Sequence, residues 1–268
     1  MAFAGRLTRF IFRIAILLMI MLAGMWIAFS RPVWLDREHW KESAVVNPSA
    51  LKQHVERLCA DFFPRDHRHP ENLFRAAGYI RNQFQQSGAV VYDHSYEVEG
   101  LHYRNVMGEY GPESRAVFIV GAHYDAVSGT LGADDNASGV AGLLELGRLL
   151  SNTSLSSRVI LAAYTLEEPP YFASDLMGSA VHARVLKDDK IHVKLMICFE
   201  MIGYFSDEPD SQQYPLPFLN LYYPSAGNFI GIVDHFFSTQ AWAMKRWMQK
   251  TIDLPVYSIN APKWLPGV

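Results

Sequence analysis

The chain has 268 residues, of which 50% are hydrophobic, and a formal net charge of −3 at pH 7. It lacks the excess of positive charge that nucleic-acid binding requires, so nucleic acid is excluded as a partner. Two cysteines, Cys59 and Cys198, are too few for a disulfide-rich scaffold. Cys198 lies in an apolar run, where a buried free thiol is expected.

Residues 11–30 are predicted to form a transmembrane anchor. The segment 14–29 is uncharged and strongly apolar, and a snorkelling Arg13 extends it toward the roughly 20 residues that a spanning helix needs. Arginines on the amino side place residues 1–10 in the cytoplasm and the rest of the chain outside it, in the periplasm or the extracellular space. A cleaved signal peptide is the alternative, with Ala-Phe-Ser at 28–30 as its cleavage site, but the apolar run is long for a signal core.

Residues 31–46 are expected to form a linker and 47–268 one globular domain. The domain begins with two amphipathic helices and two alternating strands, which we expect to pair as antiparallel edge strands joined near Gly100. The helices are predicted at 47–59 and 72–87, and the strands at 90–97 and 102–109. Between the helices, the histidine-bearing segment 65–69 is flanked by prolines and is expected to be an exposed loop rather than a metal site.

Three apolar, β-branched runs follow and predict buried strands at 116–120, 159–165 and 192–199. Residues 136–150 between the first two have helical spacing, with Asp135 and Asn136 at the capping end. The alternation of strands and helices predicts an α/β fold. We expect a three-layer α/β/α sandwich with a mostly parallel mixed sheet and helices on both faces.

Acidic and histidine residues lie just beyond these strands, where ligands bind in open α/β sheets. They are His123, Asp125, Asp134, Asp135, Glu167, Glu168 and Glu200. Alone, Asp-Asp-Asn before a helix is most often an N-cap and a Glu-Glu pair a solvated loop. Glu200 is flanked by apolar residues, so burying it would be costly without a partner. Together, however, the residues at the strand ends predict a metal site.

The residue types suit zinc chemistry. Zinc binds imidazole nitrogen and carboxylate oxygen, and two neighbouring metals need a carboxylate that bridges them. A further carboxylate must take the proton from water, and the neighbours Glu167 and Glu168 can divide the roles of base and ligand. Asp125, two residues from His123, suits an acceptor that fixes the imidazole tautomer.

The last part of the chain is predicted to contain a helical stretch at 227–237, a strand at 254–259 and the beginning of a loop at 261–268. His235 lies in the apolar helical stretch, where a histidine is more often a core or surface side chain than a ligand.

Four motifs resemble the signature blocks of the dizinc aminopeptidases of metallopeptidase family 28. They are Gly-Ala-His-Tyr-Asp at 121–125, Gly-Ala-Asp-Asp-Asn-Ala-Ser-Gly at 132–139, Leu-Glu-Glu at 166–168 and Glu-Met-Ile-Gly-Tyr at 200–204. The resemblance runs from about Leu51 to the end of the chain, with the blocks in the family's order. It implies the zinc exopeptidase type of α/β sandwich.

The resemblance also implies roles for single residues. Its metal ligands correspond to His123, Asp135, Glu168 and Glu200. Asp135 would bridge two zinc ions, and His123 and Glu200 would share one of them. Glu167 corresponds to the general base, and Asp125 to the aspartate behind the histidine.

The family's last ligand is a histidine in a loop after the final strands, and this sequence ends within the corresponding loop. We therefore expect that the C-terminal part of the domain is missing. The complete enzyme would bind two Zn²⁺ ions, of which this chain provides fully for one.

The function predicted from these features is that of a membrane-anchored zinc aminopeptidase that hydrolyses N-terminal residues of peptides. Two alternatives remain at this point. One is a catalytically impaired or dead member of the family that acts as a membrane-anchored binding domain. The other is an acyl transferase similar to glutaminyl cyclases, which share the fold and use one zinc.

Overall fold

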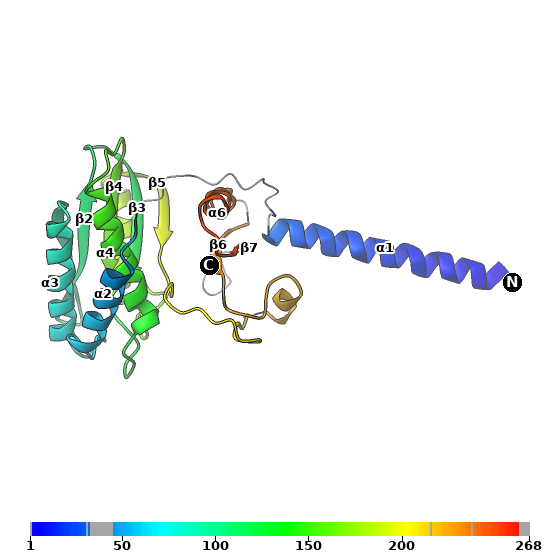
Figure 1. The fold of residues 1–268 in the computed structure, drawn as a ribbon, viewed down its shortest axis with the longest axis horizontal. Helices are drawn as coiled ribbons and strands as arrows, with labels where there is room; N and C mark the ends of the chain where they lie inside the picture. The colour runs from blue at the N-terminus through cyan, green and yellow to red at the C-terminus, as the bar shows by residue number, and fades with distance from the viewer. Residues whose placement is uncertain (1, 31, 33–44, 215, 237, 263–268) are drawn as a thin grey trace. The chain divides into compact units, whose positions relative to one another are not determined.

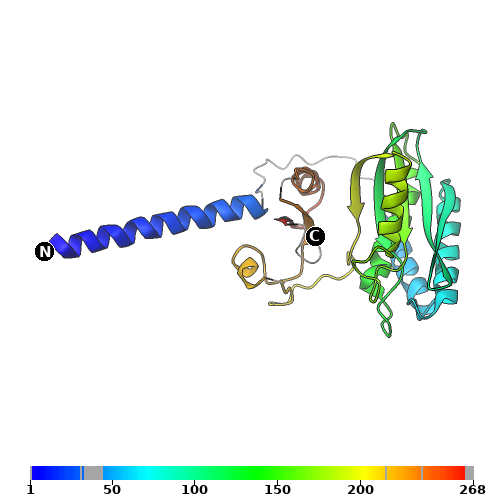
Figure 2. The same ribbon diagram turned by 180° about the vertical axis from the view of Figure 1, so that it is seen from behind.

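The chain folds into two compact units, one of residues 44–204 and the other of residues 1–43 together with 205–268. The computed structural model, whose elements appear in Figure 1 and Figure 2, describes residues 2–30, 32, 45–214, 216–236 and 238–262. Most of the predicted linker 31–46 and the end of the predicted loop 261–268 lie outside the described residues.

The larger unit contains a five-stranded sheet and four α-helices. Its elements in chain order are α2 Pro48–Ala60, α3 Pro70–Gln86, β1 Val90–Val98, β2 Leu101–Tyr110, β3 Ala116–His123, α4 Gly139–Leu150, β4 Arg158–Tyr164, α5 Gly178–Asp188 and β5 His192–Cys198. All of the elements predicted between residues 47 and 199 are present. For the two helices before the sheet and for the five strands, the ends lie within three residues of the prediction.

The sheet is mixed, with the strand order β1-β2-β4-β3-β5. β3 is parallel to both β4 and β5, whereas β2 is antiparallel to β1 and to β4. The prediction that β2 is an edge strand is therefore wrong, because β2 lies between β1 and β4. The expected mixed α/β fold is confirmed.

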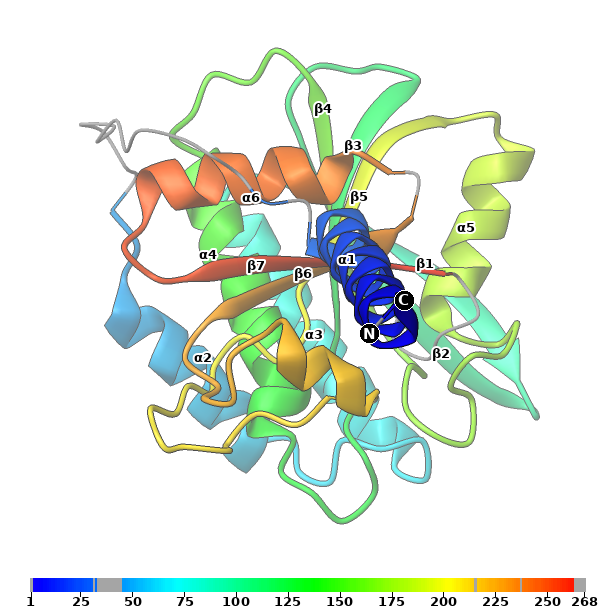
Figure 3. The same cartoon turned by 90° about the vertical axis from the view of Figure 1, so that its right-hand side faces the viewer.

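Helices cover both faces of this sheet. Alternate residues of each strand point to opposite faces, so each face has its own apolar side chains to bury. The main core cluster includes Val106 and Leu161 of the sheet together with residues of α2, α3 and α4. The smaller cluster includes Met107 and Ile160, and Leu186 of α5 packs against it. Figure 3 shows α5 to one side of β3 and β5 and α4 to the other. The site-bearing strands are thus held between two apolar layers.

Cys59 and Cys198 are both free, with Cys59 buried and Cys198 exposed. The expectation of a buried thiol at residue 198 is wrong, because the residue ends β5 at the edge of the sheet.

The smaller unit contains α1 Ala2–Ser30, the 3₁₀ helix η2 Pro217–Leu221, β6 Ile230–His235, α6 Gln240–Thr251 and β7 Val256–Ala261. β6 and β7 pair in parallel, and α6 connects them. The helix predicted at 227–237 is wrong, since 230–235 form a strand. Half-buried and exposed residues alternate along that stretch, which is strand periodicity. β7 confirms the late strand, beginning two residues after the predicted start.

The N-terminal helix α1 includes a 22-residue segment, Arg9–Ser30, that is long and apolar enough to cross a membrane, and a cleaved signal sequence would pass the same test. Its last residue is bound within the smaller unit. Lys245 Nζ and Ser258 Oγ both donate to the carbonyl oxygen of Ser30, the latter at 2.8 Å. The ring of Phe29 lies 6.1 Å from that of Phe218.

His182 of α5 is part of the interior on the second face of the sheet. The side chain of Tyr164 places its hydroxyl oxygen 2.9 Å from His182 Nδ1, a contact in which the hydroxyl can donate to a neutral ring. Burial, followed by the neighbouring His94, lowers the pKa of His182 from 6.5 to about 4. The folded protein therefore favours the uncharged imidazole.

This preference predicts a loss of stability in acid. As the pH falls below 6.5, His182 becomes protonated in the unfolded chain, whereas in the folded protein it stays neutral down to about pH 4. The free energy of unfolding therefore decreases as the pH falls from 6.5 to 4. Between pH 7 and pH 5 the contribution is about 2 kcal/mol. Urea unfolding at both pH values should show a smaller loss for His182→Asn, which keeps an acceptor for Tyr164, than for the wild type. Exposed His102→Asn is the control. An equal loss in all three proteins would contradict the prediction.

Candidate metal centre

The carboxyl ends of three parallel strands bring the predicted site residues to one edge of the sheet. His123 is the last residue of β3 and stands opposite Tyr164, the last of β4. The pairing extends beyond the strands: Tyr124 N donates to Tyr164 O at 2.8 Å, and Phe199 N to Gly121 O at 2.8 Å. The segments that follow β3, β4 and β5 therefore begin side by side.

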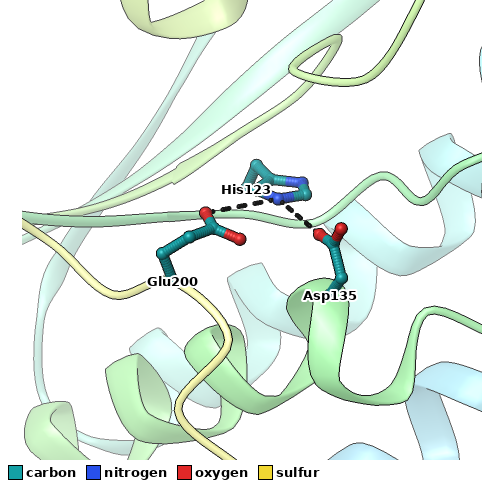
Figure 4. Close-up of side chains that lie close together, drawn as sticks. All are labelled: His123, Asp135 and Glu200. Carbon is teal, nitrogen blue, oxygen red and sulfur yellow. Dashed lines mark ion pairs between the residues drawn. The ribbon is translucent and has the colours of Figure 1, made fainter. Parts of the chain in front are cut away.

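His123 lies at the centre of this edge, with a side chain that is 3% exposed. Its Nε2 is 3.1 Å from Asp135 Oδ1, 3.5 Å from Glu200 Oε2 and 3.7 Å from Glu167 Oε2. Figure 4 shows the ring with Asp135 to one side and Glu200 to the other. Its Nδ1 faces Asp125 instead, at 3.2 Å from the carbonyl oxygen and 3.5 Å from Oδ1. The two ring nitrogens thus face different groups.

Asp125 connects His123 with the segment after β4. The aspartate is 1% exposed, and its Oδ2 accepts a hydrogen bond from Glu168 N at 3.0 Å. Because the same carboxylate lies beside His123 Nδ1, one buried side chain sets the position of both the imidazole and the Glu167-Glu168 pair.

The charges in this cluster are unbalanced. Burial alone would lower the pKa of His123, but the neighbouring carboxylates of Asp125, Asp135 and Glu200 outweigh burial and raise the pKa well above 6.5. Burial raises the pKa of both Glu167 and Glu168 to about 7, and nearby carboxylates add to that effect. Carboxylates packed this closely favour any cation that neutralises them.

Several polar atoms of the cluster have no hydrogen-bond partner among the described residues and could bind a metal ion. In the described part of the chain, His123 Nε2, Asp125 Oδ1 and Glu168 Oε1 are buried without a hydrogen-bond partner. A buried polar atom without a partner is costly. Two overlapping groups, His123 with Asp135 and Glu200, and His123 with Glu167 and Glu168, have potential ligand atoms within 4.8 Å of one another. Imidazole nitrogen with carboxylate oxygens is a donor set that suits zinc.

Glu200 is held in place by Asn136. Asn136 Nδ2 donates to Phe199 O at 2.8 Å and to Glu200 Oε2 at 3.2 Å, and its Oδ1 accepts from Gly139 N at 3.0 Å. The last bond is the capping contact expected before α4, although Asp135 and Asn136 are themselves not helical. The side chain of Glu200 is 47% exposed, so the apolar neighbours do not bury it as its sequence context suggested.

Two further side chains of the segment Ala133–Ser138 hold the residues after Glu200. Asp134 Oδ1 accepts from Gly203 N at 2.8 Å and from Tyr204 N at 3.1 Å. Ser138 Oγ accepts from Ile202 N at 3.0 Å and donates to Asp134 O at 2.7 Å. Sequence reasoning did not assign these positioning contacts. The only signal for them was that these residues lie within the Asp-Asp-Asn-Ala-Ser motif.

The segment 65–69 is not the exposed loop expected from its prolines. Arg65 is 1% and Asp66 2% exposed, because this segment packs beneath the loop that follows β3, where Ala126 N donates to Arg65 O at 2.8 Å. His69 Nδ1 lies 2.9 Å from Asp66 Oδ1. Among the described residues, no potential metal group includes His67 or His69.

Comparison with known proteins places this site in a family. The model of peptidase family M28 matches residues 105–252, more than half of the chain. The uncharacterized protein YfbL of Escherichia coli (strain K12) is 44% identical over 231 residues, which cover 83% of this chain and 71% of that protein. The chain therefore belongs to peptidase family M28.

Other relatives match more narrowly. Leucine aminopeptidase 2 of Trichophyton rubrum is 37% identical over 101 residues, 37% of this chain and 19% of that protein. Among solved structures, a leucine aminopeptidase precursor from Bacteroides thetaiotaomicron has a TM-score of 0.55 at 18% identity, covering 82% of this chain and 90% of that chain. Porphyromonas gingivalis glutaminyl cyclase has a TM-score of 0.57 at 18% identity, covering 82% and 86%. These structures confirm the expected fold.

The contacts of Asn136 predict that Asn136→Asp destabilises the protein. The substitution keeps Oδ1 but replaces the donor to Phe199 and Glu200 by a carboxylate oxygen, which leaves a buried carbonyl unpaired and adds repulsion. We expect a loss of about 1–3 kcal/mol in the free energy of unfolding. Urea unfolding at pH 7 without metal measures it, with exposed Asn152→Asp as the matched control. Equal stability of the two variants would show that the Asn136 contacts contribute nothing.

Proposed function

We propose that this chain is a zinc-dependent exopeptidase, an aminopeptidase that hydrolyses the N-terminal residues of peptides. The observation that carries the proposal is the position of His123, whose unpartnered Nε2 faces Asp135, Glu167 and Glu200 at the carboxyl edge of the sheet. Membership of peptidase family M28 supports peptide hydrolysis, and the match to leucine aminopeptidases supports cleavage at the amino terminus.

We assign the metal ligands to four side chains. His123, Asp135 and Glu200 would hold one ion, and their potential ligand atoms lie within 4.8 Å of one another. Asp135 and Glu168 would serve a second ion, with Asp135 shared. When bound, zinc supplies a Lewis acid that polarises the scissile carbonyl and lowers the pKa of water.

Glu167 is assigned as the general base. Its side chain is 24% exposed, so water and substrate can reach it, and its carboxylate lies 3.7 Å from His123 Nε2. Burial raises the pKa of this carboxylate to about 7 in the metal-free site. As a carboxylate it can accept a proton from the attacking water and return it to the departing amine.

Asp125 orients His123 and does not itself react. With Asp125 accepting at Nδ1, that nitrogen keeps its proton, and Nε2 would give up its own proton to offer a lone pair to a bound ion. Its second oxygen, bonded to Glu168 N, fixes the turn that presents Glu167.

The decisive experiment measures hydrolysis of aminoacyl arylamides and unblocked peptides by the purified 268-residue chain. A chelator should abolish hydrolysis and added Zn²⁺ should restore it. Glu167→Gln should lower kcat by roughly 10²–10⁴-fold while the bound zinc is retained, because the amide cannot accept the proton. Glu113→Gln, a residue outside the metal groups, is the control with unchanged kcat.

The other outcomes identify the alternatives. Hydrolysis that survives Glu167→Gln would show that the assignment of the base is wrong. Cyclisation of N-terminal glutaminyl peptides without hydrolysis would favour the acyl-transferase hypothesis. That alternative is worth testing because glutaminyl cyclases have a similar fold. Zinc binding without either reaction would indicate a binding domain.

We further propose that α1 anchors the protein in a membrane, with the site on the extracytoplasmic side. The chain should then remain in the membrane fraction after alkaline carbonate extraction and keep its original N-terminus by mass spectrometry. Ile20→Arg puts a charge in the middle of the apolar run, which costs about 2.5–3.5 kcal/mol at the centre of a membrane, and should release part of the protein. A mature N-terminus near Ser30 would show instead that the segment is a cleaved signal.

A further inference from the structure

Arg65 is the largest fully buried side chain in the described part of the chain, at 1% exposure. It lies between α2 and α3, outside the residues that match the family model. Within the described residues, no carboxylate comes within 4.0 Å of its guanidinium, since none of the ion pairs there includes it. A buried cation without an ion-pair partner needs another reason to be there.

The guanidinium instead donates to four main-chain carbonyls from three segments. Nε donates to Tyr124 O at 2.7 Å and Nη2 to Gly132 O at 2.9 Å. Nη1 donates to Leu58 O at 2.7 Å and to Leu131 O at 3.1 Å. A planar fork of donors makes this possible, because it can meet several fixed acceptors at once.

Two of these segments carry the site. Tyr124 stands between His123 and Asp125, while Gly132 comes three residues before Asp135. Arg65 therefore bonds the backbone beside the imidazole and the backbone beside the carboxylate whose Oδ1 lies 3.1 Å from His123 Nε2. All four of these hydrogen bonds go to main-chain carbonyls and none to a side chain of the site.

Gly132 shows how tightly this contact is built. The residue has φ +58°, and a Cβ placed there would lie 2.9 Å from Arg65 Nη2, 2.6 Å from Asp135 O and 2.5 Å from the Cβ of Ala126. No side chain fits between the guanidinium and the turn that leads to Asp135. The approach of Arg65 and the path of this turn depend on each other.

We propose that Arg65 is a positioning residue for the metal centre, which fixes the spacing of His123 and Asp135 by tying together the two backbone segments that carry them. The inference rests on the proposed function, because it takes these two side chains as ligands of one ion. Loss of the contact leaves both ligands present but lets their separation vary, so the site binds zinc less tightly and the bound substrate is less well aligned for reaction.

The test compares Arg65→Lys and Arg65→Met with the wild type as full 268-residue chains in detergent. Lysine keeps the charge but has no planar fork, and methionine keeps the apolar stem without charge or donors. We expect both variants to bind Zn²⁺ about 10–100-fold more weakly in competition with a chromophoric chelator, as for other groups that support metal ligands. At saturating zinc, kcat should fall while KM changes little.

Arg75→Lys is the matched control. Arg75 also donates to a main-chain carbonyl, Asp61 O at 2.8 Å, from the neighbouring helix α3, but it is exposed, and its hydrogen bonds within the described residues go to Asn72 and Asp61 and not to the site segments. It should retain wild-type zinc affinity. The zinc-induced rise in the unfolding midpoint distinguishes an effect on the metal site from a general loss of stability. A variant that is only less stable shows the same rise as the wild type. A variant with weaker zinc binding shows a smaller rise.

Each outcome decides the inference. Arg65→Lys with wild-type zinc affinity and kcat would overturn it, as would an equal loss of affinity in Arg75→Lys. If neither Arg65 variant folds even with zinc present, Arg65 serves the fold as a whole and the inference is again wrong. A wild-type chain that binds no zinc would refute the proposed function itself, a result distinguishable from failure of the Arg65 variants alone.

Discussion

The convergence of three parallel strand ends is the constraint on which the site depends. β3 and β4 finish at paired residues, and the hydrogen bonds of Tyr124 and Phe199 continue the alignment past the strands. The residues that follow β3, β4 and β5 therefore begin at the same edge of the sheet, although they are far apart in sequence. His123 meets the acidic side chains there because β3, β4 and β5 run in the same direction and end at the same edge of the sheet.

Carboxylates that lie close together around one imidazole repel one another, and hydrogen bonds hold them in place against this repulsion. Asp125 receives the Nδ1 side of His123 and the amide of Glu168, while Asn136 donates to Glu200. Carboxylate oxygens of Asp135, Glu167 and Glu200 remain within 3.7 Å of His123 Nε2. The raised pKa values of Glu167 and Glu168 express the remaining repulsion, which a bound cation would relieve.

The groups that hold the site are themselves held by main-chain contacts. Asp134 and Ser138 bind the amides of residues 202–204, and Arg65 binds the carbonyls of Leu131 and Gly132, just before the segment Ala133–Ser138. Backbone atoms are suitable acceptors and donors for such a purpose, because their positions are set by the fold rather than by side-chain rotamers. Together these contacts fix the backbone on which Asp135 lies, in the segment Ala133–Ser138.

The sequence by itself determined the strands, the helices before them and the order of the acidic motifs, because apolar periodicity and capping residues are local features. It also located His123 and Glu200 at strand ends and Asp135 before a helix. Only the tertiary structure decided that 230–235 is a strand, where a short apolar run suits either element. It alone placed Arg65 in the interior, since a buried arginine needs acceptors that come from residues 58, 124, 131 and 132. Such acceptors are distant in sequence, and no local pattern can reveal them.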